Sequence, residues 1–265
     1  AGEASDGLVC IENAATHGPG PDGNDVTSPR AFVHRSHSGH YGIVNSEEGY
    51  QNLTRFLFGA LRVDGILDID DISLPVAVAK ALQAGKTVRA SYQFEVAVGI
   101  RGCQWQITRR EARENSAIFR SYDELFPGQP GTTRPPDRSR SPHLFSVFLD
   151  PSKSVKASGS VSFAFDLKIL VPDYEVDGVL FMKRHYEGGY ILRQQILVEA
   201  FPDDGAPTGW RIKYGYQEDN PGRPGKDAPT YALAGGAGLA FDIEVAQRTR
   251  PGVAGRLHVE ARPWN

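Results

Sequence analysis

The sequence has few cysteines, no excess of charge of one sign and no long apolar run. Its 265 residues include only two cysteines, Cys10 and Cys103. This number excludes a disulfide-dense scaffold and leaves open either one bridge or two free thiols. The formal net charge of −3 gives no support for binding to nucleic acid or to an anionic membrane surface. No stretch approaches the ~18 apolar residues of a membrane-spanning helix, so no transmembrane segment is expected.

What is present is the composition of a globular protein. Hydrophobic residues make up 40% and charged residues 23%, which excludes wholesale disorder. The composition changes near Gly59, because the chain before it is rich in loop residues and the chain after it alternates between apolar and polar residues. We therefore expect two domains, residues 1–59 and residues 60–265.

Period-two alternation of apolar residues runs through most of residues 60–265 and predicts strands. The segments with this pattern are 61–67, 88–100, 104–109, 144–149, 161–171, 178–182, 191–200, 210–216, 239–246 and 255–261. Short turns separate them, which is typical of an antiparallel sandwich or barrel. One helix is expected at 74–85, with Pro75 in its first turn. Residues 185–190, which hold two glycines, are expected to form a hairpin turn.

Residues 1–59 predict a loop, a strand and a helix in that order. Residues 17–30 are rich in Gly, Pro, Asp and Asn and predict a surface loop. Residues 31–35 form a short strand candidate. A helix is predicted at 45–58, where Asn45 is an N-cap candidate and Glu48 completes a capping box.

Two segments of this first region gather residues suited to acid–base catalysis. Asp6 lies in a tight turn, Ser-Asp-Gly-Leu-Val, just before an apolar pair. His34, His37 and His40 lie between the predicted strand and the predicted helix. A histidine base must be presented on a loop at the end of a rigid element, and its second ring nitrogen must meet a carboxylate. An acid in one such turn and a histidine in the next meet both needs.

These segments resemble the C-terminal end of an α/β-hydrolase of the lipase/esterase type. Asp-Gly-Leu-Val resembles the acid turn of that family, and His-Ser-Gly-x-x-Gly-Ile-Val-Asn-Ser resembles the histidine loop before its last helix. The resemblance implies that Asp6 is the catalytic acid and His37 the base, with His40 as the alternative. It also implies an ester or lipid-like small-molecule substrate and no cofactor.

The nucleophile of that family is missing, since no Gly-x-Ser-x-Gly and no HGGG-type oxyanion loop occur in the sequence. The resemblance covers only residues 1–59. It implies that the serine lies in an upstream hydrolase domain of the same parent protein. The expected fold is therefore mixed: the C-terminal fragment of an α/β-hydrolase sheet, consisting of a strand and the last helix, joined to a mainly antiparallel β-sandwich.

Several alternatives stay open. Asp22 and Asp25 are rival acids, and the evenly spaced histidines form a candidate metal site with Asp6 or His17. The acidic residues around Asp173 suggest calcium, although their spacing fits no EF-hand loop. The β region by itself is a candidate non-catalytic module that binds lipid or a protein partner, with residues 1–59 as a remnant.

Overall fold

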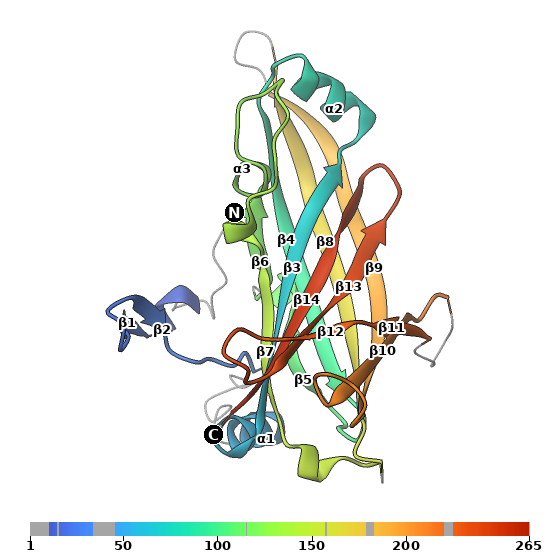
Figure 1. Cartoon of the computed structure of the whole chain (residues 1–265). Coiled ribbons are helices and arrows are strands. Elements are labelled where there is room, and N and C mark those ends of the chain that lie inside the picture. Colours follow the sequence, from blue (N-terminus) through green and yellow to red (C-terminus); the bar gives the residue numbers. More distant parts are fainter. Residues whose placement is uncertain are drawn as a thin grey trace.

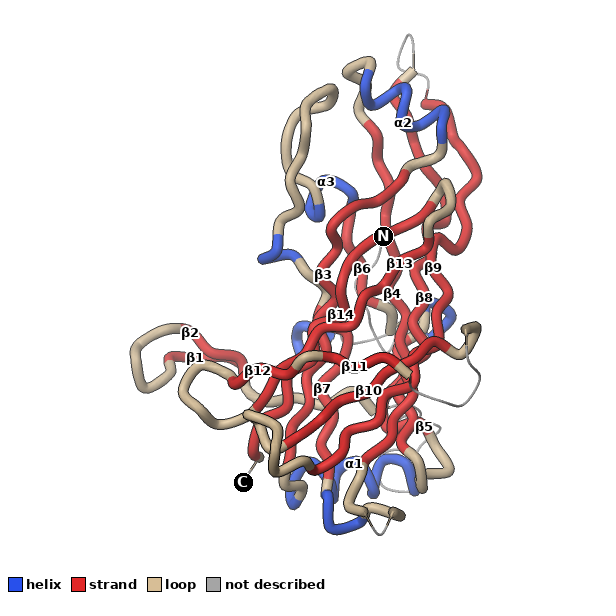
Figure 2. The backbone as a smooth tube through the Cα atoms, turned by 45° about the vertical axis from the view of Figure 1, so that its right-hand side comes forward, coloured by secondary structure: helices blue, strands red, loops and turns tan. Residues whose placement is uncertain are grey.

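The computed structural model describes residues 11–14, 16–33, 46–114, 116–156, 158–178, 183–219 and 225–264. About half of these residues belong to strands, and the long strands run along one axis of the molecule, with helices α1 and α2 at opposite ends (Figures 1 and 2). The helices are α1 (Glu47–Phe58), α2 (Val76–Gln83) and α3 (Tyr122–Leu125). None of the helices in the described part of the chain has the length and apolarity needed to cross a bilayer.

Three sheets are formed by the strands. A small hairpin pairs β1 (His17–Pro19) with β2 (Asp25–Thr27). The seven-stranded sheet has the order β11-β10-β9-β8-β4-β5, with β6 also paired to β4, and the five-stranded sheet has the order β12-β13-β14-β3-β7. Their strands are β3 (Leu61–Ser73), β4 (Val88–Ile100), β5 (Gln106–Arg110), β6 (Ile118–Ser121), β7 (His143–Leu149), β8 (Val161–Asp177), β9 (Lys183–Pro202), β10 (Trp210–Tyr216), β11 (Lys226–Ala228), β12 (Thr230–Ala232), β13 (Leu239–Gln247) and β14 (Gly252–Pro263).

The hydrophobic core fills the space between the two large sheets. Alternate residues of each strand point inward, so the period-two pattern of the sequence places one apolar face of each sheet against the other. Phe145 of β7 stacks on Phe165 of β8, with 5.1 Å between the ring centroids, and this contact joins the two sheets. Gly65 of β3 lies opposite Phe145 and leaves room for its ring.

The α/β-hydrolase part of the expected fold is wrong. Every strand pair among the described residues is antiparallel, so no parallel sheet flanked by helices is present there. Residues 31–33 of the expected strand 31–35 form no strand. Instead, the Phe32 carbonyl accepts a hydrogen bond from Thr108 Oγ1 at 2.9 Å, and the Arg110 guanidinium lies 4.2 Å from the Phe32 ring centroid. These contacts attach the segment to side chains of β5. Residues 34 and 35 lie outside the described residues.

The β-rich expectation for the rest of the chain is confirmed. The strand expected at 178–182 stays a prediction, because residues 179–182 lie outside the described residues. The hairpin expected at 185–190 is wrong, because these residues lie inside β9, a continuous strand of 20 residues. Their two glycines allow β8 and β9 to approach closely beside a bulge and form no turn. A Cβ on Gly188 would approach the Val171 carbonyl oxygen to 2.0 Å, and Gly189 has φ of 154°, close to an irregularity of register between β8 and β9.

Both predicted helices are confirmed. The helix predicted at 45–58 is α1, and its N-cap is Ser46 rather than Asn45, since the Ser46 side chain accepts a hydrogen bond from the Gly49 backbone N–H. The helix predicted at 74–85 is α2, which Pro75 precedes and Gly85 follows at φ of 77°.

The close approach of Phe145 to Gly65 gives a stability prediction. An added Cβ at residue 65 would lie 2.3 Å from two carbons of the Phe145 ring, and this ring is fully buried. We expect Gly65→Ala to lower the free energy of unfolding by about 1–3 kcal/mol, measured by urea denaturation. In a Phe145→Leu background the same substitution should cost clearly less. An equal cost in both backgrounds would contradict this explanation.

Candidate functional site

The structure leaves the predicted catalytic pair undescribed. Asp6, His37 and His40 all lie outside the described residues, and so does His34. The roles assigned to Asp6 and His37, the alternative role of His40 and the metal site of three histidines therefore stay predictions. The rival acids can be placed, because both belong to the β1–β2 hairpin and both are exposed.

Asp22 is occupied by its own turn. Its carboxylate accepts hydrogen bonds from the Asn24 side-chain amide at 2.7 Å and from the Asn24 backbone N–H at 3.1 Å. These bonds hold the pKa of the Asp22 carboxyl below its usual value. Asp25 pairs with Pro19 at the end of the same hairpin. Asp22 thus acts as a turn residue.

A serine, a histidine and an aspartate meet on the outer face of β3 and β7. Ser146 Oγ donates a hydrogen bond to Asp64 and lies 3.0 Å from His143 Nε2. Arg62 completes the group with an ion pair to Asp64 at 2.9 Å. Burial alone raises the pKa of the Asp64 carboxyl, but the hydrogen bonds from His143 and Ser146 and the charge of Arg62 outweigh it and lower the pKa.

These three residues have the composition of a catalytic triad without its geometry. In a triad the histidine lies between serine and carboxylate and uses one ring nitrogen for each. Here the Ser146 hydroxyl points to Asp64, and the single nitrogen Nε2 of His143 faces Ser146, the Phe145 carbonyl at 2.8 Å and Asp64 at 3.5 Å. A nitrogen that donates to a carbonyl has no lone pair to take a proton from serine. The group therefore ties β3 to β7.

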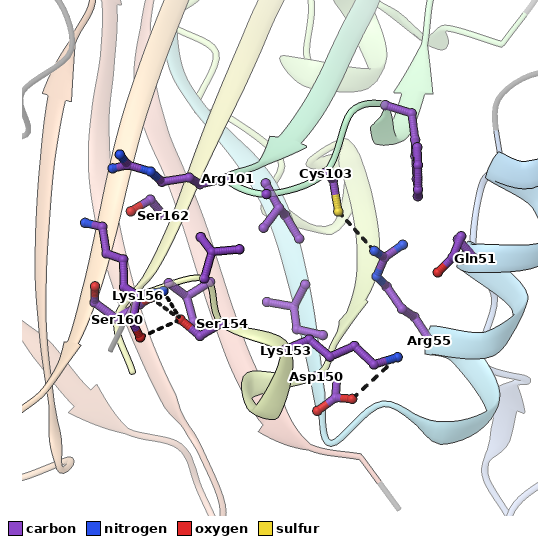
Figure 3. A pocket seen from close by; sticks show the side chains of 16 residues that line it. Gln51, Arg55, Arg101, Cys103, Asp150, Lys153, Ser154, Lys156, Ser160 and Ser162 are labelled. Carbon is purple, nitrogen blue, oxygen red and sulfur yellow. Dashed lines mark hydrogen bonds and ion pairs between the residues drawn. The ribbon is translucent and has the colours of Figure 1, made fainter. Parts of the chain in front are cut away.

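A cleft lies beside α1 (Figure 3). Gln51 and Arg55 of α1 form one wall, and Ser160 and Ser162 stand on the opposite side. The turn between β4 and β5 and the segment after β7 complete the lining, and the volume is about 260 Å³. Four of the lining side chains are cationic: Arg55, Arg101, Lys153 and Lys156.

Two of these cations are neutralised and Arg55 is not. Lys153 Nζ lies 3.8 Å from Asp150, and Lys156 forms an ion pair with Glu199. In the described part of the chain no carboxylate lies within ion-pairing distance of Arg55; its Nη2 donates instead to the thiol sulfur of Cys103 at 3.0 Å (Figure 3). Cys103 is a free cysteine.

Two buried donors in this cleft lack an acceptor within the described structure. They are Arg55 Nη1 and Trp105 Nε1, and the guanidinium carbon of Arg55 lies 6.0 Å from the Trp105 ring centroid. A buried donor without a partner costs about 1–3 kcal/mol, so a ligand that brings an acceptor oxygen gains this energy. The cleft can therefore hold a carboxylate or a similar anionic group. Sequence reasoning missed it, because Arg55 and Cys103 are 48 positions apart and no motif links them.

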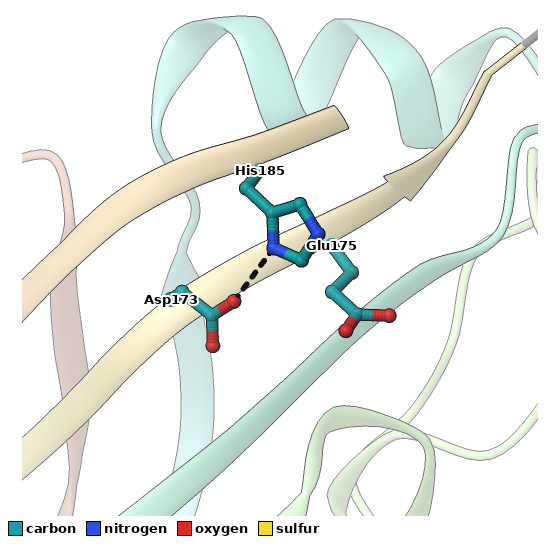
Figure 4. A group of neighbouring side chains, drawn as sticks. All are labelled: Asp173, Glu175 and His185. Carbon is teal, nitrogen blue, oxygen red and sulfur yellow. Dashed lines mark hydrogen bonds and ion pairs between the residues drawn. The ribbon is translucent and has the colours of Figure 1, made fainter. Parts of the chain in front are cut away.

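Asp173, Glu175 and His185 form a second cluster, on the exposed face of β8 and β9 (Figure 4). One ligand atom from each lies within 4.8 Å of the others. The atoms already have partners, since His185 Nδ1 lies 3.0 Å from Asp173 and Lys183 pairs with Glu175 at 2.6 Å. These contacts are ion pairs and hydrogen bonds between side chains of the neighbouring strands β8 and β9. They account for Asp173 and Glu175, two of the acidic residues that suggested calcium, without a bound ion.

His258 of β14 contacts carboxylates through both of its ring nitrogens. Its Nδ1 lies 2.8 Å from Asp242, and its Nε2 lies 3.3 Å from Glu260. Burial disfavours the charged ring, but the hydrogen bonds and charges of Asp242 and Glu260 outweigh this effect and raise the pKa of His258. The Tyr231 hydroxyl also contacts Nδ1, at 3.1 Å.

This raised pKa predicts a pH-dependent contribution to stability. The stabilisation by His258 is complete below the pKa of an unfolded histidine, about 6.5, and is lost as the pH rises through the higher folded pKa. We expect His258→Gln to lower the free energy of unfolding by about 0.5–1 kcal/mol at pH 5.5 and by much less at pH 9. Urea denaturation at both pH values measures this, with the exposed His17→Gln variant as control. A loss that grows with pH would contradict the assignment.

Comparisons with known proteins assign no family. No protein-family model, no curated protein and no solved structure matches this chain.

Proposed function

We propose that this chain is the C-terminal portion of a serine hydrolase that cleaves carboxylic esters of lipid-like character. Its nucleophilic serine and oxyanion hole belong to a segment upstream in the parent protein, because the sequence contains neither motif. The serine attacks the ester carbonyl, and His37 takes its proton and returns it to the leaving alcohol. Asp6 orients the His37 ring and stabilises its charged form.

The observation that carries this proposal is the helix that follows the histidine segment. The resemblance to the hydrolase family calls for a helix directly after the motif that ends in Asn45-Ser46, and α1 begins at Glu47 with Ser46 as its cap. Glu47 and Glu48 in its first turn interact favourably with the helix dipole. Helix α1 thus starts ten residues after His37. A catalytic loop needs a rigid element of this kind close by to position its side chains.

The two sides of α1 add support. One side is fixed to the β region: the Phe56 ring packs against Phe148 at 4.8 Å, and Trp264 Nε1 donates to the Phe56 carbonyl at 2.7 Å. On the other side apolar side chains face outward, with Tyr50 63% and Phe58 75% exposed. Exposed apolar residues gathered on one helix are typical of a surface that another domain covers. The proposed upstream domain is such a partner.

The cleft beside α1 is compatible with the same reaction. Ester hydrolysis releases a carboxylate, and the unpaired donors Arg55 Nη1 and Trp105 Nε1 suit such a group.

Hydrolysis of a p-nitrophenyl ester by the parent protein tests the proposal. We expect His37→Ala to lower kcat by about 10⁴-fold, because loss of the base removes activation of the serine. The matched control is His143→Ala, which should keep its activity because the Ser146 group is no triad. The 265-residue chain alone should be nearly inactive, since it lacks the nucleophile.

The variant His40→Ala distinguishes the two candidate bases. Loss of activity in this variant with full activity in His37→Ala would assign the role of base to His40. Full activity in both variants would overturn the proposal.

A further inference from the structure

An apolar cavity of about 350 Å³ lies between the two large sheets. Its walls come from both: β3, β13 and β14 on one side, and β8, β9 and β10 on the other. It occupies the end of the sandwich that also carries α1 and the C-terminus (Figure 1). The volume falls at the lower end of the ~300–1,000 Å³ found for small-molecule sites.

Small residues create this cavity. The interior elsewhere is filled by large side chains such as Phe94, Phe165 and Leu167. The cavity wall instead contains five residues with a methyl group or no side chain: Ala200, Ala232, Gly236, Gly238 and Ala261. Gly238 has φ of 126°, and a Cβ there would lie 2.4 Å from the Ala261 carbonyl oxygen. The close approach of the β14 backbone therefore requires glycine at residue 238.

The lining offers no partner to a charged group inside the cavity. None of the described side chains that line the cavity is charged. The hydroxyl group of Thr208 is already engaged, at 2.8 Å from Thr230 Oγ1 and 3.2 Å from the Trp210 carbonyl oxygen. Phe163 and Trp210 are only partly buried, so the cavity can be reached from solvent. An empty apolar space forfeits dispersion contacts that an apolar guest restores.

From these features we infer that the sandwich binds the alkyl chain of a single-chain amphiphile, such as a fatty acid, between its sheets. The chain lies against Phe163 and Trp210, and the polar head group stays at the open end. The cavity is too small for both chains of a phospholipid. This binding requires no ester bond and no serine, so it stands independently of the proposed hydrolysis.

Fluorescence titration of the 265-residue chain with 11-(dansylamino)undecanoic acid tests the inference. We expect saturable binding that dodecanoate reverses and that butyrate at equal concentration does not, because the two competitors share a head group and differ in chain length. Absence of saturable binding, or equal competition by both acids, would overturn the inference.

Two substitutions on the same strand locate the site. Ala261→Phe fills the cavity and should weaken binding at least tenfold, whereas Ala254→Phe, on the outer face of β14, should leave the affinity unchanged. If Ala261→Phe fails to fold, judged by circular dichroism, Ala200→Leu on the opposite wall replaces it with the same expected loss. Unchanged affinity in a folded cavity variant would place the probe elsewhere and contradict the inference.

Discussion

Burial of one face of each large sheet against the other is the constraint on which the rest of this structure depends. The stack of Phe145 on Phe165 joins the sheets, and Gly65 is required because that ring needs its space. Because the inner faces are apolar, charged residues are confined to the outer faces, where Asp64 and His258 each build a hydrogen-bonded group. At the end near α1, small residues leave a cavity open between the sheets.

Much of the β architecture was accessible from the sequence, because period-two alternation reports directly which residues face a core. The segments predicted at 88–100 and 210–216 coincide with β4 and β10. Strands of three or four residues, such as β6 and β11, are too short to show a period. The glycine pair at 188 and 189 led to the wrong prediction of a turn. Glycine is common at turns and also beside bulges, and only the pairing of β9 with β8 distinguishes the two. The strand expected at 31–35 is not formed at residues 31–33, where the Phe32 carbonyl accepts a hydrogen bond from the Thr108 side chain, and such a contact leaves no pattern in the sequence.

The candidate sites were less accessible, for a different reason. The cleft beside α1 depends on contacts such as that between Arg55 and Cys103, and the cavity depends on small residues drawn from strands far apart in the chain. Such sites are properties of the assembled sheets and leave no local motif. Conversely, Asp6 and His37 belong to segments with a recognisable local pattern, and α1 stands where that pattern requires a helix. The proposed site therefore consists of Asp6 and His37, which a sequence motif suggests, beside α1, which the structure describes.

The central claim is that Asp6 and His37 act together on a serine of the parent protein. A crystal structure of that parent protein tests it most directly. The account predicts that an Asp6 carboxylate oxygen lies within about 3.2 Å of His37 Nδ1, with His37 Nε2 facing a serine hydroxyl. Placement of the two side chains in separate parts of the molecule, with no pocket in common, would contradict it.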